Sequence, residues 1–257
     1  MTAGEVAALL ASSFAAGVMN ALAGGGTILT FPTLLLLGVP AIQANATSTV
    51  ALLPGAAASM AGYRREVATH RAWLKSLFLP SLVGGGVGSV LLLKTPDKLF
   101  ASLAPFLVLF ATLLFLLQIV LARRKERGEA HAPSGPSAAR WGVATLAQLA
   151  VAVYGGYFGA GIGILMLVLL GFLGLTDIHA MNGLKNFFGI SINLVAAAWF
   201  AANGAVLWPV ALVMVAGATA GGWAGARFAR RIGKEKARAA VVAIGLFVTA
   251  VLLLQRG

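Results

Sequence analysis

The sequence has no cysteine and few charged residues, and both shortages exclude large groups of functions. Without cysteine the chain can form no disulfide, no thiolate metal site and no cysteine nucleophile. Only 10% of its 257 residues are charged, against about 25% in ordinary soluble domains, while 60% are hydrophobic. This composition predicts an all-α polytopic membrane protein. With three histidines and seven carboxylates, we expect no metal site and no cofactor.

Signals of enzyme active sites are also missing. The chain contains no G-x-S-x-G elbow, no H-E-x-x-H and no P-loop sequence. A catalytic base would have to come from His70, His131 or His179, and the first two lie in polar segments. We therefore expect neither an enzyme nor a catalytic residue.

Ten apolar runs fill the chain, five on each side of a polar segment at 122–140. A helix that spans a bilayer needs about 20 mostly apolar residues. The polar segment combines seven charged residues with Pro133, Ser134, Gly135 and Pro136, which is typical of a solvated linker. The predicted division is a first membrane repeat at 1–121, a cytoplasmic basic linker at 122–140 and a second membrane repeat at 141–257. The runs are 5–22, 27–38, 41–62, 72–93, 99–121, 141–158, 162–174, 178–200, 206–226 and 237–254.

The two halves match as an internal repeat. A shift of 137 residues places Asn45 on Asn182 and Gly84 on Gly221, and a shift of 136 places Gly25 on Gly161. Chance matching in a chain rich in leucine, alanine and glycine is the alternative, but the polar matches fall in register with the apolar runs. An odd number of crossings in each half would give the two repeats opposite orientations in the membrane.

The basic residues agree with this topology. Fifteen of the 19 Lys and Arg fall in the loops at 62–76, 122–140 and 226–238, and three fall on the other side. By the positive-inside rule the first set is cytoplasmic, and both termini are then periplasmic. The net charge of +12 is explained by membrane orientation, so we expect no nucleic-acid partner.

The second run of each half is too short to cross a membrane. The runs 27–38 and 162–174 would make helices of about 18 to 20 Å, and glycine clusters precede both. Short, glycine-interrupted segments at matching positions of two halves indicate discontinuous helices at a binding site near mid-membrane. The N-termini of these short helices suit an anion. For two other glycine rows, Gly84-xxx-Gly88 and Gly217-xxx-Gly221-xxx-Gly225, close helix packing is the simpler explanation. The candidate binding residues here are Gly24, Gly25, Gly26, Thr27, Gly159, Gly161 and Gly163.

The third run of each half carries polar residues on one helical face. These are Asn45, Ser48 and Thr49 in the first half and Asn182, Lys185 and Asn186 in the second. A charge inside a spanning segment is costly unless it is paired or faces water. Lys185 could form a salt bridge with Asp177 or extend to the interface; alternatively it coordinates an anionic substrate together with Asn182 and Asn186.

Asp177 and His179 are the candidates for proton coupling. Both stand at the turn between the second and third runs of the second half, where few other titratable groups occur. A helix cap for Asp177 and an interfacial position for His179 are the alternatives. The coupling role is a hypothesis that depends on their distance from the transport pathway.

These motifs resemble a known family. The segments 24–32 (GGGTILTFP) and 44–48 (ANATS) resemble the signatures of the TauE/SafE sulfite exporter family, and 181–186, 203–208 and 221–226 are similar to its YfcA-like branch. The resemblance covers nearly the whole chain and implies a bacterial inner-membrane permease for sulfite, organosulfonates or related small anions. The second glycine cluster, Gly159-Ala160-Gly161-Ile162-Gly163, departs from the triple glycine of the first.

We therefore expect a secondary transporter of two inverted repeats, each with a discontinuous short helix pair and about three full transmembrane helices. Its site would bind a small sulfur-containing anion at mid-membrane, between the repeats. A channel or carrier for another solute and a membrane scaffold are the alternatives. The expected partners are the anionic substrate and the lipid bilayer, and assembly with further copies of the chain stays open.

Overall fold

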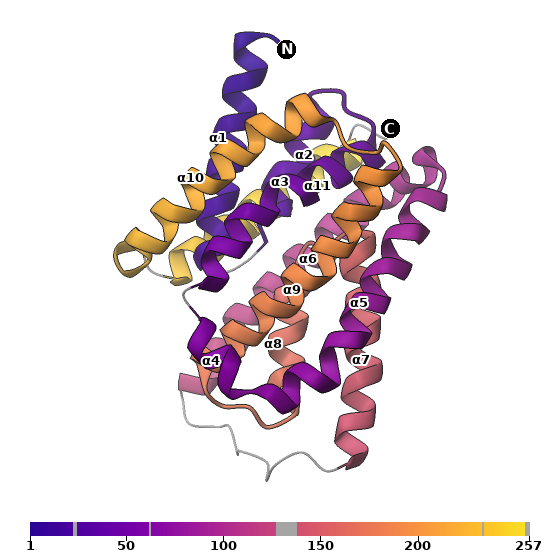
Figure 1. The fold of residues 1–257 in the computed structure, drawn as a ribbon. Coiled ribbons are helices and arrows are strands. Elements are labelled where there is room, and N and C mark those ends of the chain that lie inside the picture. Colours follow the sequence, from indigo (N-terminus) through magenta and orange to yellow (C-terminus); the bar gives the residue numbers. More distant parts are fainter. Residues whose placement is uncertain (23–24, 62, 127–137, 233, 255–257) are drawn as a thin grey trace.

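The structure is a computed structural model that describes residues 1–22, 25–61, 63–126, 138–232 and 234–254. These residues form eleven helices and no strand (Figure 1), which confirms the all-α prediction. The helices are α1 (Ala3–Leu22), α2 (Thr27–Leu36), α3 (Ala41–Ala61), α4 (Arg64–Thr69), α5 (Arg71–Lys94), α6 (Asp97–Glu126), α7 (Ala138–Tyr157), α8 (Ile162–Phe172), α9 (Ile178–Ala202), α10 (Trp208–Ile232) and α11 (Lys234–Leu254).

Five helices of the described chain are long and apolar enough to cross a membrane: α1, α5, α6, α9 and α10. The two short helices α2 and α8 are apolar too, with 10 and 11 residues. Helix α3 is 21 residues long but carries a row of polar side chains, most of them buried. The chain is accordingly a multi-pass membrane protein.

Two predicted boundaries differ from the structure. Helix α6 continues through the basic residues to Glu126, and α7 begins at Ala138, so the ends of the predicted linker at 122–140 are helical. Arginine, lysine and glutamate are good helix formers, and nothing in Arg123–Glu126 ends the helix. The intervening residues 127–137 lie outside the described chain. The short helix α4 was not predicted, because its sequence has the polar character of a loop.

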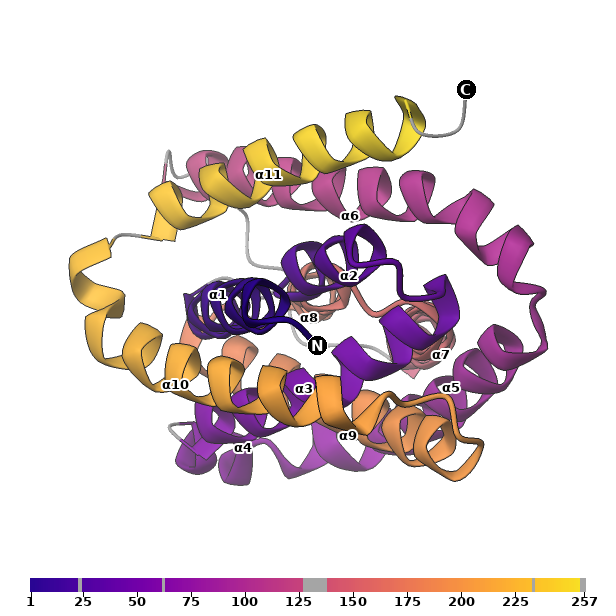
Figure 2. The ribbon, with the colours of Figure 1, turned by 90° about the horizontal axis from the view of Figure 1, so that it is seen from above.

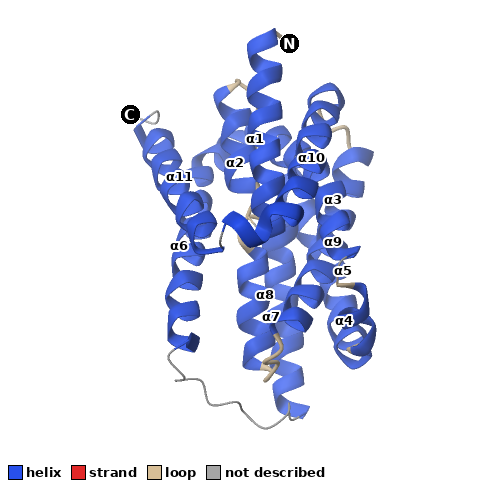
Figure 3. Cartoon of the chain, turned by 90° about the vertical axis from the view of Figure 1, so that its left-hand side faces the viewer, coloured by secondary structure: helices blue, strands red, loops and turns tan. Residues whose placement is uncertain are grey.

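Two helical hairpins enter the molecule from opposite ends. Helix α1 begins at the end where α11 finishes, and α7 begins at the other end (Figure 1). Each is followed by a short helix that turns back toward its own end, so that α1 and α2 occupy one half of the height and α7 and α8 the other (Figure 3). In each half a short helix thus follows a helix of 20 residues and turns back beside it, at the places where the short apolar runs were predicted.

The two halves of the chain interlock. Helix α1 packs on α10 and α5 on α7, so each first helix contacts the opposite half. Viewed from above, α6 and α11 lie side by side along one edge, and α5, α9 and α10 lie along the other (Figure 2). A side chain at Gly88 would collide with the carbonyl oxygen of Val153, and one at Gly221 with that of Phe14. The glycine rows therefore permit close helix packing, as predicted.

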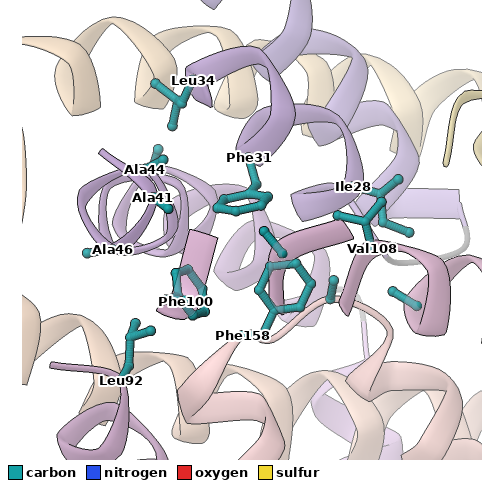
Figure 4. Close-up of a cluster of buried hydrophobic side chains, with 14 of the residues drawn as sticks. Ile28, Phe31, Leu34, Ala41, Ala44, Ala46, Leu92, Phe100, Val108 and Phe158 are labelled. Atoms are coloured by element: carbon teal, nitrogen blue, oxygen red, sulfur yellow. The ribbon is translucent and has the colours of Figure 1, made fainter. Parts of the chain in front are cut away.

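A cluster of aromatic rings joins the two hairpins. Phe31 of α2 lies 5.2 Å from Phe158, which follows α7, and 6.1 Å from Phe100 of α6, measured between ring centroids. All three side chains are fully buried (Figure 4). Edge-to-face aromatic pairs of this kind contribute about 0.5 to 1.5 kcal/mol beyond their buried area. The cluster fixes α2 against the tip of the second hairpin, which brings both tips to the centre of the molecule.

Candidate functional site

A cavity of about 100 Å³ lies where the two hairpin tips meet α3 and α9. Sites for drug-sized ligands measure about 300 to 1,000 Å³, so this cavity suits a small solute. Its lining comes from both halves of the chain. The lining residues are Asn20, Gly25, Thr27, Thr49, Leu52, Leu53, Ala56, Gly159, Gly161, Ile162, Gly163, Lys185, Asn186, Gly189, Ile190 and Asn193.

The two long helices at the cavity contribute matching positions. Each presents one face at i, i+3, i+4 and i+7, the spacing that places side chains in one stripe. Every lining residue of α3 has its counterpart 137 residues later in α9, at the same shift that aligns the halves in the sequence. The pairs are Thr49 with Asn186, Leu52 with Gly189, Leu53 with Ile190, and Ala56 with Asn193.

Glycines form the tips of both hairpins. Gly25 has φ +90° and Gly161 has φ +81°, a left-handed conformation that favours glycine. Directly after these turns α2 and α8 begin, so their N-termini lie at the cavity. The first N–H groups of a helix have no partner within it and carry a partial positive charge. Both helix N-termini therefore favour an anion in the cavity.

Side-chain hydrogen bonds hold the tips in place. The amide oxygen of Asn20 accepts from the backbone N–H of Gly26 at 2.8 Å. The hydroxyl of Tyr154 donates to the carbonyl of Ala160 at 2.7 Å. Unwound backbone inside a membrane is tolerated where its polar groups find partners or line a cavity, and these tips meet both conditions.

Among the described residues that line the cavity, Lys185 is the only one with an ionisable side chain. It is 9% exposed, and its Nζ donates to Oδ1 of Asn182 at 3.2 Å. Its aliphatic stem lies against Gly163, where a Cβ atom would be 3.1 Å from Cδ. Since no carboxylate is among these lining residues, the cavity combines one cation with two helix N-termini and neutral donors. That arrangement can bind a small anion.

The structure brings most of the predicted binding residues together. Eight of them line the cavity: Gly25, Thr27, Thr49, Gly159, Gly161, Gly163, Lys185 and Asn186. Asn182 holds the ammonium of Lys185, and Gly26 is held by Asn20. Gly24 lies outside the described residues.

Asn45 and Ser48 are buried beside the cavity instead of lining it. The amide nitrogen of Asn45 donates to the carbonyl of Tyr157 at 3.0 Å, and the hydroxyl of Ser48 bonds to that of Thr30. Asn45 lies one turn before Thr49, and Ser48 lies at the side of the cavity-facing stripe. At the position that matches Ser48, Lys185 reaches the cavity because its side chain is much longer.

Among the lining residues that were not predicted from the sequence, Asn20 and Asn193 are the two with polar side chains. Asn193 lies two turns after Asn186 on the same face of α9, and this i, i+7 spacing could have identified it. Asn20 gives no comparable signal, because its counterpart under the shift of 136 that places Gly25 on Gly161 is Gly156.

Asp177 and His179 lie away from the cavity lining. Both are exposed at the start of α9, where the carboxylate of Asp177 accepts from the backbone N–H of His179 at 2.9 Å and caps the helix. This cap accounts for the aspartate. The coupling role of the pair stays a prediction.

Comparisons with known proteins identify the family of the chain. The sequence model of the family described as sulfite exporter TauE/SafE matches residues 9–252. A "Probable membrane transporter protein" of Haemophilus influenzae is 30% identical, over 98% of this chain and 96% of its own length. A "Probable membrane transporter protein ORF9" of a Sinorhizobium species is 27% identical (94% and 89%), and the "Probable membrane transporter protein YfcA" of Escherichia coli K12 is 25% identical (93% and 86%). No solved structure matches the chain.

Proposed function

Because this chain belongs to the TauE/SafE sulfite exporter family, we propose that it is a secondary transporter of small sulfur-containing anions such as sulfite or organosulfonates. It acts as a permease without enzymatic chemistry. We place it in a bacterial inner membrane, since its relatives with the same extent are bacterial membrane transporters by name.

The observation that carries the proposal is the position of Lys185. A buried cation is costly unless it is paired or hydrogen-bonded. Here it lies 9% exposed at a cavity between two helix N-termini, with an amide as its hydrogen-bond partner. An anion in this cavity would be attracted by the ammonium, whereas a neutral solute would gain nothing from its charge.

The neutral donors around the lysine suit an oxyanion. Asn20, Thr27, Asn186 and Asn193 offer amides and a hydroxyl from three helices, while the hydroxyl of Thr49 donates to the carbonyl of Asn45 at 2.9 Å. Several oxygens of one small anion can accept from such a set at once. The cavity volume of about 100 Å³ favours compact anions over aromatic sulfonates.

For the transport cycle we propose alternating access between two inverted repeats. Support comes from the opposite entry of the two hairpins (Figure 1) and from the matched cavity faces of α3 and α9. Both termini would face the periplasm, since the start of α7 and helix α4, with their basic residues, lie at the opposite end. The end of α10 and the start of α11 lie between the two ends of the molecule in Figure 1, so the predicted cytoplasmic loop at 226–238 adds no support to this orientation.

The test is a thermal-shift titration of the purified protein with sulfite, sulfate, sulfoacetate, isethionate, toluenesulfonate and acetate. We expect a saturable rise in Tm with one compact sulfur oxyanion, and no rise in the Lys185→Met variant. Lys94→Met, which removes an exposed lysine at the end of α5, is the matched control and should respond as the wild type does. If no anion raises Tm, a different solute or a scaffold role is favoured.

A further inference from the structure

Asn45 has a buried amide oxygen without a hydrogen-bond partner. The side chain is 1% exposed, and its nitrogen is committed to the carbonyl of Tyr157 at 3.0 Å. This bond fixes the orientation of the amide, so that Oδ1 faces the other way. Among the described residues, Oδ1 is the buried side-chain polar atom that finds no partner. A buried amide oxygen in that state calls for an unseen ligand, because leaving it unpaired is costly.

The matching residue of the other half shows what such an oxygen binds. Asn182, 137 residues later, accepts from the ammonium of Lys185 at 3.2 Å. Three residues after Asn45 the first half has Ser48 instead of a lysine. One half therefore has an amide oxygen with a cation, and the other has an equivalent amide oxygen without one.

We propose that a sodium ion binds at Oδ1 of Asn45, at the position that corresponds to the ammonium of Lys185. Further oxygens are close in the fold. The hydroxyl of Ser48 lies one turn along α3, and it is bonded to the hydroxyl of Thr30. All three side chains are buried in the described structure.

The end of α7 adds an electrostatic reason. Tyr157 is the last residue of this helix, which stops inside the molecule. The last carbonyl groups of a helix have no partner within it and carry a partial negative charge. The carbonyl of Tyr157 is itself bonded to the amide nitrogen of Asn45, so this helix end would act on a nearby sodium ion through its partial charge and not as a ligand.

The chemistry of the donors selects the ion. Amide, hydroxyl and carbonyl oxygens are hard, neutral ligands, which suit a hard cation. Divalent cations are held in proteins chiefly by carboxylates, and the described residues contain no cluster of acidic or histidine side chains. None of Asn45, Ser48 and Thr30 gains or loses a proton near neutral pH, so the site responds to sodium and not to protons.

The sodium site stands on its own geometry, but its use in coupling rests on the proposed function. Sodium at Asn45 and an anion at Lys185 would occupy matching positions of the two halves. Opposite charges at these places would favour joint binding of the two ions. Sodium would then be the ion whose transport is coupled to that of the anion.

The experiment is a thermal-shift titration of the purified full chain with sodium chloride against choline chloride at constant ionic strength. A ligand that binds only the folded state raises Tm in a saturable way. We expect such a rise with sodium for the wild type, and no difference between the two salts for Asn45→Leu. Asn203→Leu is the matched control, because Asn203 also donates to a backbone carbonyl but is exposed; it should keep the sodium response.

Two further variants keep the test decisive if Asn45→Leu does not fold. Ser48→Ala should raise the sodium concentration at half-maximal shift roughly tenfold, because one ligand is lost. Ser48→Lys imitates the other half by placing an ammonium where the sodium ion would bind, so this variant should show no sodium response.

Identical Tm values of the wild type in sodium and choline would overturn the proposal and assign Oδ1 of Asn45 to a water molecule. An unchanged sodium response in both Asn45→Leu and Ser48→Ala would overturn it as well. No sulfur anion is present in this titration, so its failure would leave the anion site intact, and a failed anion panel would leave the sodium site intact.

Discussion

Replacing Lys185 by methionine should cost most of the affinity for the anion while preserving the fold. Methionine keeps an unbranched stem of similar length and removes only the charge and the donor. An anion in a cavity of this size would lie within about 4 Å of the ammonium, where unit charges attract by about 4 kcal/mol at an effective dielectric constant of about 20. A charge-assisted hydrogen bond alone contributes about 1.5 to 3 kcal/mol.

The expected loss is therefore about 2 to 4 kcal/mol, which is roughly 30- to 700-fold in Kd. Isothermal titration with the anion that stabilises the wild type most would measure it. Without ligand, the Tm of the variant should be equal to or above that of the wild type, because a buried charge has been removed. A Kd within twofold of the wild type in a well-folded variant would refute the assignment of Lys185 to the binding site.

Three more substitutions and one control variant test the site and the helix packing around it. Gly163→Ala places a Cβ against the stem of Lys185. We expect this overpacking to cost about 1 kcal/mol of anion binding, which is roughly a fivefold weaker Kd. The Tm should be nearly unchanged, because alanine favours the helix more than glycine does. Asn193→Leu removes one neutral donor, and titration should give a loss of only about 0.5 to 1.5 kcal/mol, or roughly two- to twelvefold. Gly88→Val forces α5 away from α7, so size-exclusion chromatography should show aggregation. The control Gly142→Ala lies in open space on α7 and should raise Tm slightly. A monodisperse Gly88→Val protein would contradict the close packing of α5 on α7.

Much of the architecture could be predicted, because a membrane helix requires a long apolar run that is visible in the sequence. The run lengths identified α2 and α8 as too short to cross, and the glycines before them identified the turns. Local composition was misleading at α6, where charged residues that resemble a linker continue a helix to Glu126. At that point helix propensity decides the structure, and it does not depend on polarity.

The binding site could be predicted in part, because spacing gives the face of a helix but not its depth. The spacing of Asn45, Ser48 and Thr49 predicts a single helical face, yet among these three residues only Thr49 lines the cavity. Which turn of α3 meets the cavity is set by how α3 crosses α9, and no local pattern encodes that crossing. Side-chain length adds a second effect, since Lys185 reaches the cavity from a position where Ser48 cannot.

The central claim is that the cavity between the two halves carries a small sulfur oxyanion across the membrane. Counterflow in proteoliposomes tests this claim most directly: vesicles loaded with unlabelled sulfite are diluted into labelled sulfite, and the uptake of label is followed. The account predicts a transient accumulation of label with the wild type and with Lys94→Met, and none with Lys185→Met. Uptake no greater than in protein-free vesicles, for sulfite and for each organosulfonate in turn, would contradict it.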